Sequence, residues 1–136
     1  MVETALVGEF VPGAAVLAGC DLLKQLDRAK LNVRAGLWIR LDEKTTWTLE
    51  LATPLVKSEG PRRVYSAVQQ ALRKLPPSSQ AVISIADVRV TTPDDALLSK
   101  LRLEVKTAPT AIVGITLRKN VINGEMFPDC YIYRNA

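Results

Sequence analysis

The stretch that most constrains the fold runs from Trp47 to Leu75, where a strand, a loop and an amphipathic helix follow one another. Apolar and polar residues alternate up to Ala52, which is the pattern of a half-buried strand. After the loop, Pro61 stands at the first-turn position that proline favours in helices. The helix that follows carries one apolar stripe, made of Val64, Ala67, Val68, Ala71, Leu72 and Leu75. A strand followed by a one-sided helix predicts helices packed on the face of a sheet.

Two elements are expected before this stretch. Apolar residues at spacings of three and four predict an amphipathic helix over residues 13–31. Alternation over 34–41 and again over 46–52, joined by the polar residues 42–45, predicts an antiparallel hairpin. This hairpin would have one core face and one outer face.

The second half of the chain shows further strands, a short helix and a closing hairpin. The strands are expected over 80–91, with a bend near Asp87, over 111–121 and over 126–133, and the helix after the capping residue Thr92. Asn123 and Gly124 form the strongest hairpin signal in the chain. Because proline cannot donate to a strand ladder, Pro128 predicts that the last strand lies at an edge or carries a bulge.

The elements therefore come in the order helix, strand, strand, helix, strand, helix, strand, strand. This order predicts a single α+β domain over residues 1–136, with about five mainly antiparallel strands in one sheet and two to three helices packed on it. Residues 1–12 are expected to form either a short first strand or a covering arm. A chain of 136 residues is long enough for one domain with its own core.

The residue types present exclude several kinds of active site. The chain has no histidine, so it cannot hold a Ser-His-Asp or Cys-His system or a metal site that needs imidazole. Cys20 and Cys130 lack the spacing of a zinc site or redox pair, and no metal or cofactor is expected. An enzyme would have to use groups such as Glu50, Tyr65 and Asp87 as acid or base.

The net charge of +4 is compatible with an acidic partner without requiring one, and the excess is spread along the chain. One local feature departs from the usual pattern. Arg62 and Arg63 stand in the first turn of a predicted helix, where positive charge is disfavoured. Together with Ser58 and the free backbone N–H groups, they suggest an anion site. The alternative is that the two arginines pair with Glu59 or other nearby carboxylates.

A second candidate surface is the outer face of the predicted hairpin. Trp38 stands beside Arg40 there, and an indole next to a guanidinium can stack on a base or another ring. Tyr65, on the following helix, is a further candidate for this surface. The alternative, which we favour for Trp38, is a strand residue covered by another element.

Leu17-Ala18-Gly19-Cys20 spells a bacterial lipoprotein cleavage signature. The preceding region has no basic residue, carries Glu3 and Glu9, and is broken by proline. The predicted helix also continues through the cleavage point. No stretch is long and apolar enough to span a membrane, and a membrane partner is not expected. We therefore favour a cytoplasmic protein with both thiols reduced.

Several segments together resemble a group of small bacterial proteins of unknown function. They are QLDRAKLNVRAGLWIRL, WTLELATPLV, GPRRVY, TTPDD and NVINGEMFPDCYIY, and the resemblance extends from about residue 19 to the end. It implies a soluble bacterial protein in which Cys20 belongs to the domain, and it implies no activity. The group's pattern has a glycine and an aromatic residue where this chain has Lys30 and Leu31.

These observations favour a non-catalytic binding or interaction module that binds a protein partner or a second copy of itself. An anion or nucleic-acid binder that uses the basic helix start at 61–63 is the first alternative. A small carboxylate-based enzyme is the second.

Overall fold

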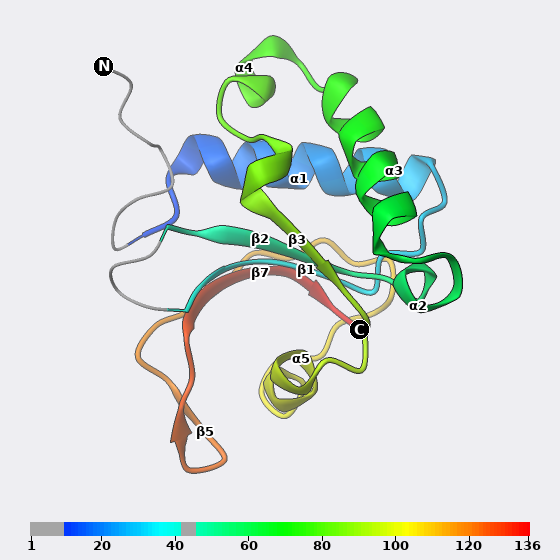
Figure 1. The fold of residues 1–136 in the computed structure, drawn as a ribbon. Helices are drawn as coiled ribbons and strands as arrows, with labels where there is room; N and C mark the ends of the chain where they lie inside the picture. Colours follow the sequence, from blue (N-terminus) through cyan, green and yellow to red (C-terminus); the bar gives the residue numbers. More distant parts are fainter. Residues whose placement is uncertain (1–9, 42–45) are drawn as a thin grey trace.

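Helix α1 (Gly13–Arg28) lies across one face of a five-stranded sheet, and Figure 1 shows it above the strands. The computed structural model describes residues 10–41 and 46–136. Of the arm or strand expected over 1–12, only residues 10–12 are described, and they do not form a strand. The polar turn expected at 42–45 lies outside the described residues.

The sheet has the strand order β3-β2-β1-β7-β4, and β5 and β6 form a separate two-stranded hairpin. The strands are β1 (Ala35–Arg40), β2 (Thr48–Ala52), β3 (Val88–Thr91), β4 (Ile115–Leu117), β5 (Val121–Ile122), β6 (Glu125–Met126) and β7 (Asp129–Asn135). Neighbours run antiparallel except β2 and β3, which run parallel. The predicted α+β domain with a mainly antiparallel five-stranded sheet is confirmed.

Helices cover the sheet on both faces, whereas the sequence predicted a hairpin with one core face. The other helices are α2 (Leu55–Glu59), α3 (Pro61–Arg73), α4 (Pro77–Gln80) and α5 (Ala96–Leu101). Figure 1 shows α1 and α3 above the sheet, with α5 and the β5–β6 hairpin below it. Trp38 of β1 packs in the core under α1, while Leu37 and Ile39 pack against α5. Both faces of β1 are therefore buried.

Strand β7 lies between β1 and β4, so the edge position expected for the last strand is wrong. Pro128 comes before the strand and takes no place in its ladder. The expected bulge does occur, but it lies near Tyr133, where Gly36 pairs with Arg134 and Leu37 with Ile132. Because the bulge resets the alternation, both Tyr133 and Arg134 reach α1.

The strand expected over 80–91 is confirmed only for Val88–Thr91. Pro77 starts the short helix α4 instead, and the Gln80 side-chain amide donates to the carbonyl of Leu75 at 2.7 Å. A 3-10 turn, Ile85–Asp87, then leads into β3, so the expected bend at Asp87 is present. In the segment before β3, side-chain hydrogen bonds satisfy backbone groups that a strand would pair within the sheet. Turns are therefore more favourable there than an extended strand.

Two local predictions near helix ends need correction. The loop expected before Pro61 is mostly helix α2, which ends at Glu59 and is followed by Gly60 with φ of 90°. The cap of α5 is Asp95, whose carboxylate accepts from the N–H groups of Leu97 at 3.0 Å and Leu98 at 3.3 Å. The Thr92 hydroxyl donates to Asp94 instead.

Helix α1 runs through Leu17–Cys20 without a break, and Gly19 lies where α1 meets the sheet. A side chain there would meet the Tyr133 hydroxyl and, at 2.9 Å, the indole nitrogen of Trp38. The Trp38 indole N–H donates a hydrogen bond to the Tyr133 hydroxyl, and this hydroxyl donates to the Val16 carbonyl. Close packing therefore explains the glycine inside a helix.

Candidate functional site

The predicted anion-site residues lie at the surface where α2 meets α3. Arg62, Arg63 and Ser58 are all exposed. Arg63 Nε lies 3.2 Å from Glu59 Oε1, which is the pairing that the alternative interpretation expected. Since Arg63 is mostly exposed, this ion pair contributes little to stability.

The residues expected on the hairpin surface are placed differently. Trp38 is fully buried, so it forms no part of a binding surface. Arg40 is nearly buried, pairs with Asp129 at 3.2 Å and lies 5.4 Å from the centre of the Trp47 ring. The half-buried Tyr65 accepts a hydrogen bond from the Val90 N–H at the outer edge of β3, at 3.1 Å. These residues do not form one exposed patch.

The three candidate acid or base residues are engaged separately. Glu50 is buried on β2, and its carboxylate lies 3.1 Å from Arg89. Burial raises its pKa, against the attraction of Arg89, and the negative charge of Asp95 adds to the rise. Asp87 accepts hydrogen bonds from Ser84. Among the described residues, no hydrogen bond or ion pair joins any two of Glu50, Tyr65 and Asp87.

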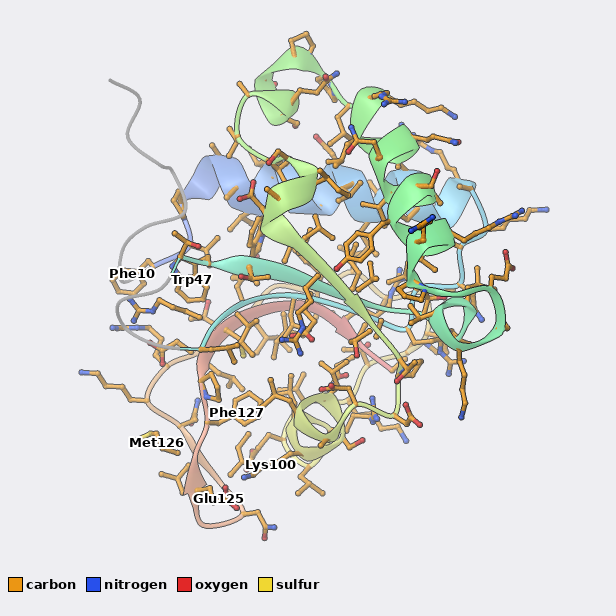
Figure 2. All side chains as sticks on the ribbon, viewed as in Figure 1. Phe10, Trp47, Lys100, Glu125, Met126 and Phe127 are labelled. Atoms are coloured by element: carbon orange, nitrogen blue, oxygen red, sulfur yellow. The ribbon has the colours of Figure 1, made fainter. Side chains whose placement is uncertain are left out.

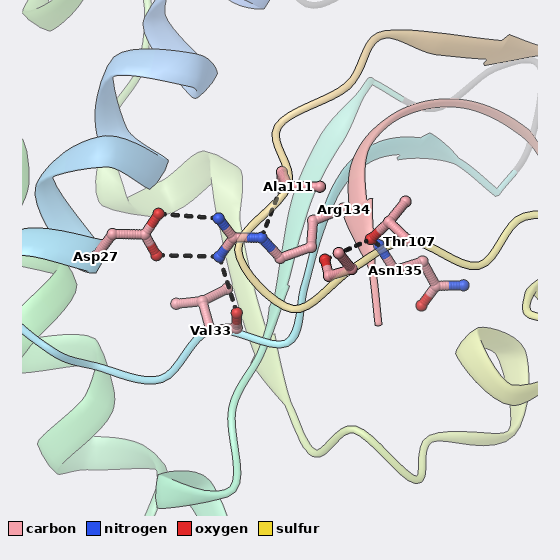
Figure 3. Close-up of polar contacts among 7 residues, drawn as sticks. Asp27, Val33, Thr107, Ala111, Arg134 and Asn135 are labelled. Carbon is pink, nitrogen blue, oxygen red and sulfur yellow. Dashed lines mark hydrogen bonds and ion pairs between the residues drawn. The ribbon is translucent and has the colours of Figure 1, made fainter.

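Arg134 forms the most complete polar cluster, which ties β7 to α1 (Figure 3). Its guanidinium meets both Asp27 carboxylate oxygens, at 3.0 and 2.9 Å. It also donates to the carbonyls of Val33 at 2.9 Å and Ala111 at 2.8 Å. With these donors used and its side chain buried, Arg134 is a structural clamp and offers nothing to a ligand.

Two adjoining hollows lie between α1, α2 and α3. The first has a volume of about 380 Å³, and its lining includes Leu31, Leu55, Glu59, Arg63 and Val64. The second has a volume of about 160 Å³, and its lining includes Gln25, Arg28, Ala29, Ala71 and Lys74. Ala67 and Gln70 of α3 line both hollows, so we treat them as one surface and call it the α1–α3 groove.

The helices around this groove carry the positive charge of the protein. Residues 13–31 and 55–75, which we call the helical layer, contain eight Lys and Arg residues but three Asp and Glu residues. The rest of the chain has ten basic and eleven acidic residues and is close to neutral. Asp27 and Glu59 of the helical layer are already paired with Arg134 and Arg63. The two sequence segments that hold the charge excess are therefore brought together in one layer of the fold.

Sequence reasoning found one end of this groove and missed the other. Arg63 lines the groove, whereas Arg62 and Ser58 do not. Arg28 and Lys74 were missed because basic residues near helix C-termini are ordinary in helices of any function. Only the packing of α1 beside α3 brings these two side chains to the same hollow.

Two more hollows lie near the start of β7, at the opposite end of this strand from Arg134. One, of about 140 Å³, is lined by Phe10, Trp47 and Cys130, among others. Burial raises the pKa of the Cys130 thiol to about 12, so this thiol stays protonated at neutral pH and is a poor nucleophile.

Over residues 10–41 and 46–136, no three Cys, Asp or Glu side chains are grouped as metal ligands. In that same part of the chain, no helix combines the length and apolarity needed to cross a bilayer.

No family model, curated protein or solved structure matches this chain. The resemblance of its WTLELATPLV and GPRRVY segments to small bacterial proteins stays a prediction. In the fold, these two segments follow one another through β2, α2 and the start of α3. They lead directly to the Arg63 end of the α1–α3 groove.

Proposed function

We propose that this protein is a non-catalytic binding module that takes an anionic partner in the α1–α3 groove. The observation that carries the proposal is the concentration of basic residues on the helical layer, while the rest of the chain is nearly neutral. A surface of one sign attracts oppositely charged partners and raises their association rate.

The chemistry of the groove lining favours binding over catalysis. Its polar groups are guanidinium, ammonium, amide and hydroxyl groups, and its one carboxylate, Glu59, is paired with Arg63. Arg28 and Lys74 are exposed, and within the described part of the chain neither has an ion-pair partner. Two such cations that line one hollow can accept a carboxylate or phosphate without first breaking another ion pair.

Retention on immobilised heparin tests the proposal. The groove variant is Arg28→Ala/Lys74→Ala, and the matched control is Lys106→Ala/Lys119→Ala, which removes two exposed cations outside the helical layer. We expect the groove variant to elute at lower salt, with the slope of log affinity against log salt reduced by about one for each lost contact. The control should elute close to the parent protein. Equal shifts for the two variants would contradict a specific groove, and no retention of the parent would contradict the proposal as a whole.

Self-association is a second candidate, supported by apolar side chains around the β5–β6 hairpin. Leu41 is 57% exposed and Met126 is 70% exposed, and both line a hollow of about 260 Å³ beside the buried Phe127. Figure 2 shows Met126 and Phe127 at the hairpin, on the far side of the sheet from α1. Light scattering coupled to size exclusion should find a dimer that Leu41→Asp/Met126→Asp converts to a monomer. A monomer at every concentration of the parent protein would remove this candidate.

A further inference from the structure

We infer that the partner of the α1–α3 groove is an acidic protein segment with an apolar anchor, and that it is not a nucleic acid. This inference rests on the proposed function and names the class of its anionic partner. It depends on three features of the groove: its apolar wall, the position of its cations and the absence of aromatic rings from its lining.

The larger hollow has apolar walls contributed by different elements. Leu31 follows α1, Leu55 belongs to α2, and Val64 belongs to α3. Ala67, at the junction with the second hollow, presents only a methyl group. A volume of about 380 Å³ with such walls can take an apolar side chain, and a phosphate backbone would leave these walls in contact with charged groups.

The cations are unevenly placed along the groove. Arg28 and Lys74 line the smaller hollow, while the larger one has Arg63, whose charge is offset by Glu59. A complementary partner therefore places carboxylates at the smaller hollow and an apolar side chain in the larger one. This pairing of an apolar anchor with a charged neighbour is typical of peptide segments bound in grooves between helices.

Binding of nucleic-acid single strands commonly adds stacking of bases on aromatic rings. None of the residues that line the two hollows is aromatic, and all of them lie in the described part of the chain. Trp38, the ring that the sequence offered for stacking, is buried under α1. These facts favour a peptide over a base-stacking ligand.

Three probes separate the alternatives: a synthetic peptide of alternating glutamate and leucine pairs, a polyglutamate peptide of equal charge, and a single-stranded oligothymidine of equal charge. Fluorescence anisotropy should give the Glu/Leu peptide an affinity at least about tenfold above that of the other two. Arg28→Ala/Lys74→Ala should weaken the binding of both peptides.

Filling the groove without changing its charge tests the apolar anchor directly. Gln70→Trp places a large ring at the junction of the hollows, and Ser66→Trp fills the larger hollow from a second exposed position. Each variant should lower the affinity for the Glu/Leu peptide at least about tenfold and the affinity for polyglutamate much less. Leu103→Trp, at an exposed position just after α5, is the control and should change neither affinity.

The outcomes separate the inference from the proposed function. Equal affinity for all three probes would overturn the acidic-peptide inference and leave an anion-binding module. The same conclusion would follow if neither Trp variant changed the affinities while its circular dichroism matched that of the parent. Tighter binding of oligothymidine would assign the groove to nucleic acid. Binding of none of the three probes would overturn both.

Discussion

Arg134 and Glu50 are equally buried charges in one sheet, each 1% exposed, and they differ in how their charge is compensated. Arg134 makes four charge-assisted hydrogen bonds, two of them to Asp27. Within the described residues, Glu50 has Arg89, which is 49% exposed, as its ion-pair partner, and its Oε1 makes no hydrogen bond of good geometry. Burial alone therefore does not tell whether a charge stabilises the fold, because its partners decide the sign.

The largest change in the free energy of unfolding is expected from Arg134→Met. The change leaves the carbonyls of Val33 and Ala111 without their donor and detaches β7 from Asp27. The free energy of unfolding should fall by about 3–5 kcal/mol, because each of the two carbonyls left without a donor costs about 1–3 kcal/mol and the pairing with Asp27 is lost. Urea denaturation followed by circular dichroism measures it.

The matched control for this variant is Asp27→Asn. Asp27→Asn removes the counter-charge of the buried Arg134, but the amide oxygen of the new side chain can still accept one of its hydrogen bonds, and Arg134 keeps its bonds to the backbone carbonyls. The loss should be clearly smaller than for Arg134→Met. An equal loss would mean that the ion pair, and not the complete set of partners, makes this cluster stable.

The next largest loss of stability is expected beside the bulge that directs Arg134 toward α1. The same bulge places the Tyr133 hydroxyl against Gly19, so Gly19→Ala adds a methyl group where no space exists. Overpacking of this kind should lower the free energy of unfolding by about 1–3 kcal/mol, although alanine is the better helix former. Thermal unfolding with Ala14→Gly as a control for helix propensity separates the two contributions. A Gly19→Ala variant as stable as the parent would contradict the close packing.

Removal of the Glu50 charge is expected to increase the free energy of unfolding. Because burial raises the pKa of Glu50 above its ordinary value of 4.5, the folded protein holds this proton more tightly than the unfolded chain does. The stability contributed by Glu50 is therefore fully present below about pH 4.5 and is lost as the pH rises through the raised pKa. Glu50→Gln removes the buried charge, and the half-exposed Arg89 can be solvated by water.

At neutral pH, the free energy of unfolding of Glu50→Gln should exceed that of the parent by about 0.5–1.5 kcal/mol, comparable to the net worth of one hydrogen bond. The difference should shrink as the pH falls toward 4.5. Urea midpoints measured across this range test both statements. Arg89→Gln, which leaves Glu50 without its cation, should shift stability in the opposite direction, and a gain from both variants would contradict this account.

The comparison also shows which features sequence patterns can predict. Periodicity identified α1, α3 and the β1–β2 hairpin, and the Asn-Gly dipeptide identified the turn at 123–124, because each is set by neighbours close in sequence. The parallel pairing of β3 with β2 and the burial of both faces of β1 depend on contacts between distant segments. The partners of Glu50 and Arg134, like the meeting of Arg28 with Lys74, are of this second kind. Arg62 and Arg63 stood out only because their charge opposes the local helix dipole.

The smallest effect concerns the end of α1 that carries Asp27. Lys30 has φ of 57°, and its N–H donates to the Asp27 carbonyl while the Leu31 N–H donates to that of Leu26. This is a Schellman ending, in which the residue at the left-handed position is usually glycine.

Lys30→Gly should therefore raise the free energy of unfolding by up to about 1 kcal/mol, since it removes the steric cost of a side chain in the left-handed conformation. The greater freedom of glycine in the unfolded chain offsets part of the gain. Lys30→Ala removes the same charge but keeps the Cβ atom, so it should give none of this gain. If the two variants were equally stable, charge rather than backbone conformation would explain any change. A gain specific to glycine would show that the helix end holding Asp27 is strained, even though the Arg134 cluster that it supports is fully bonded.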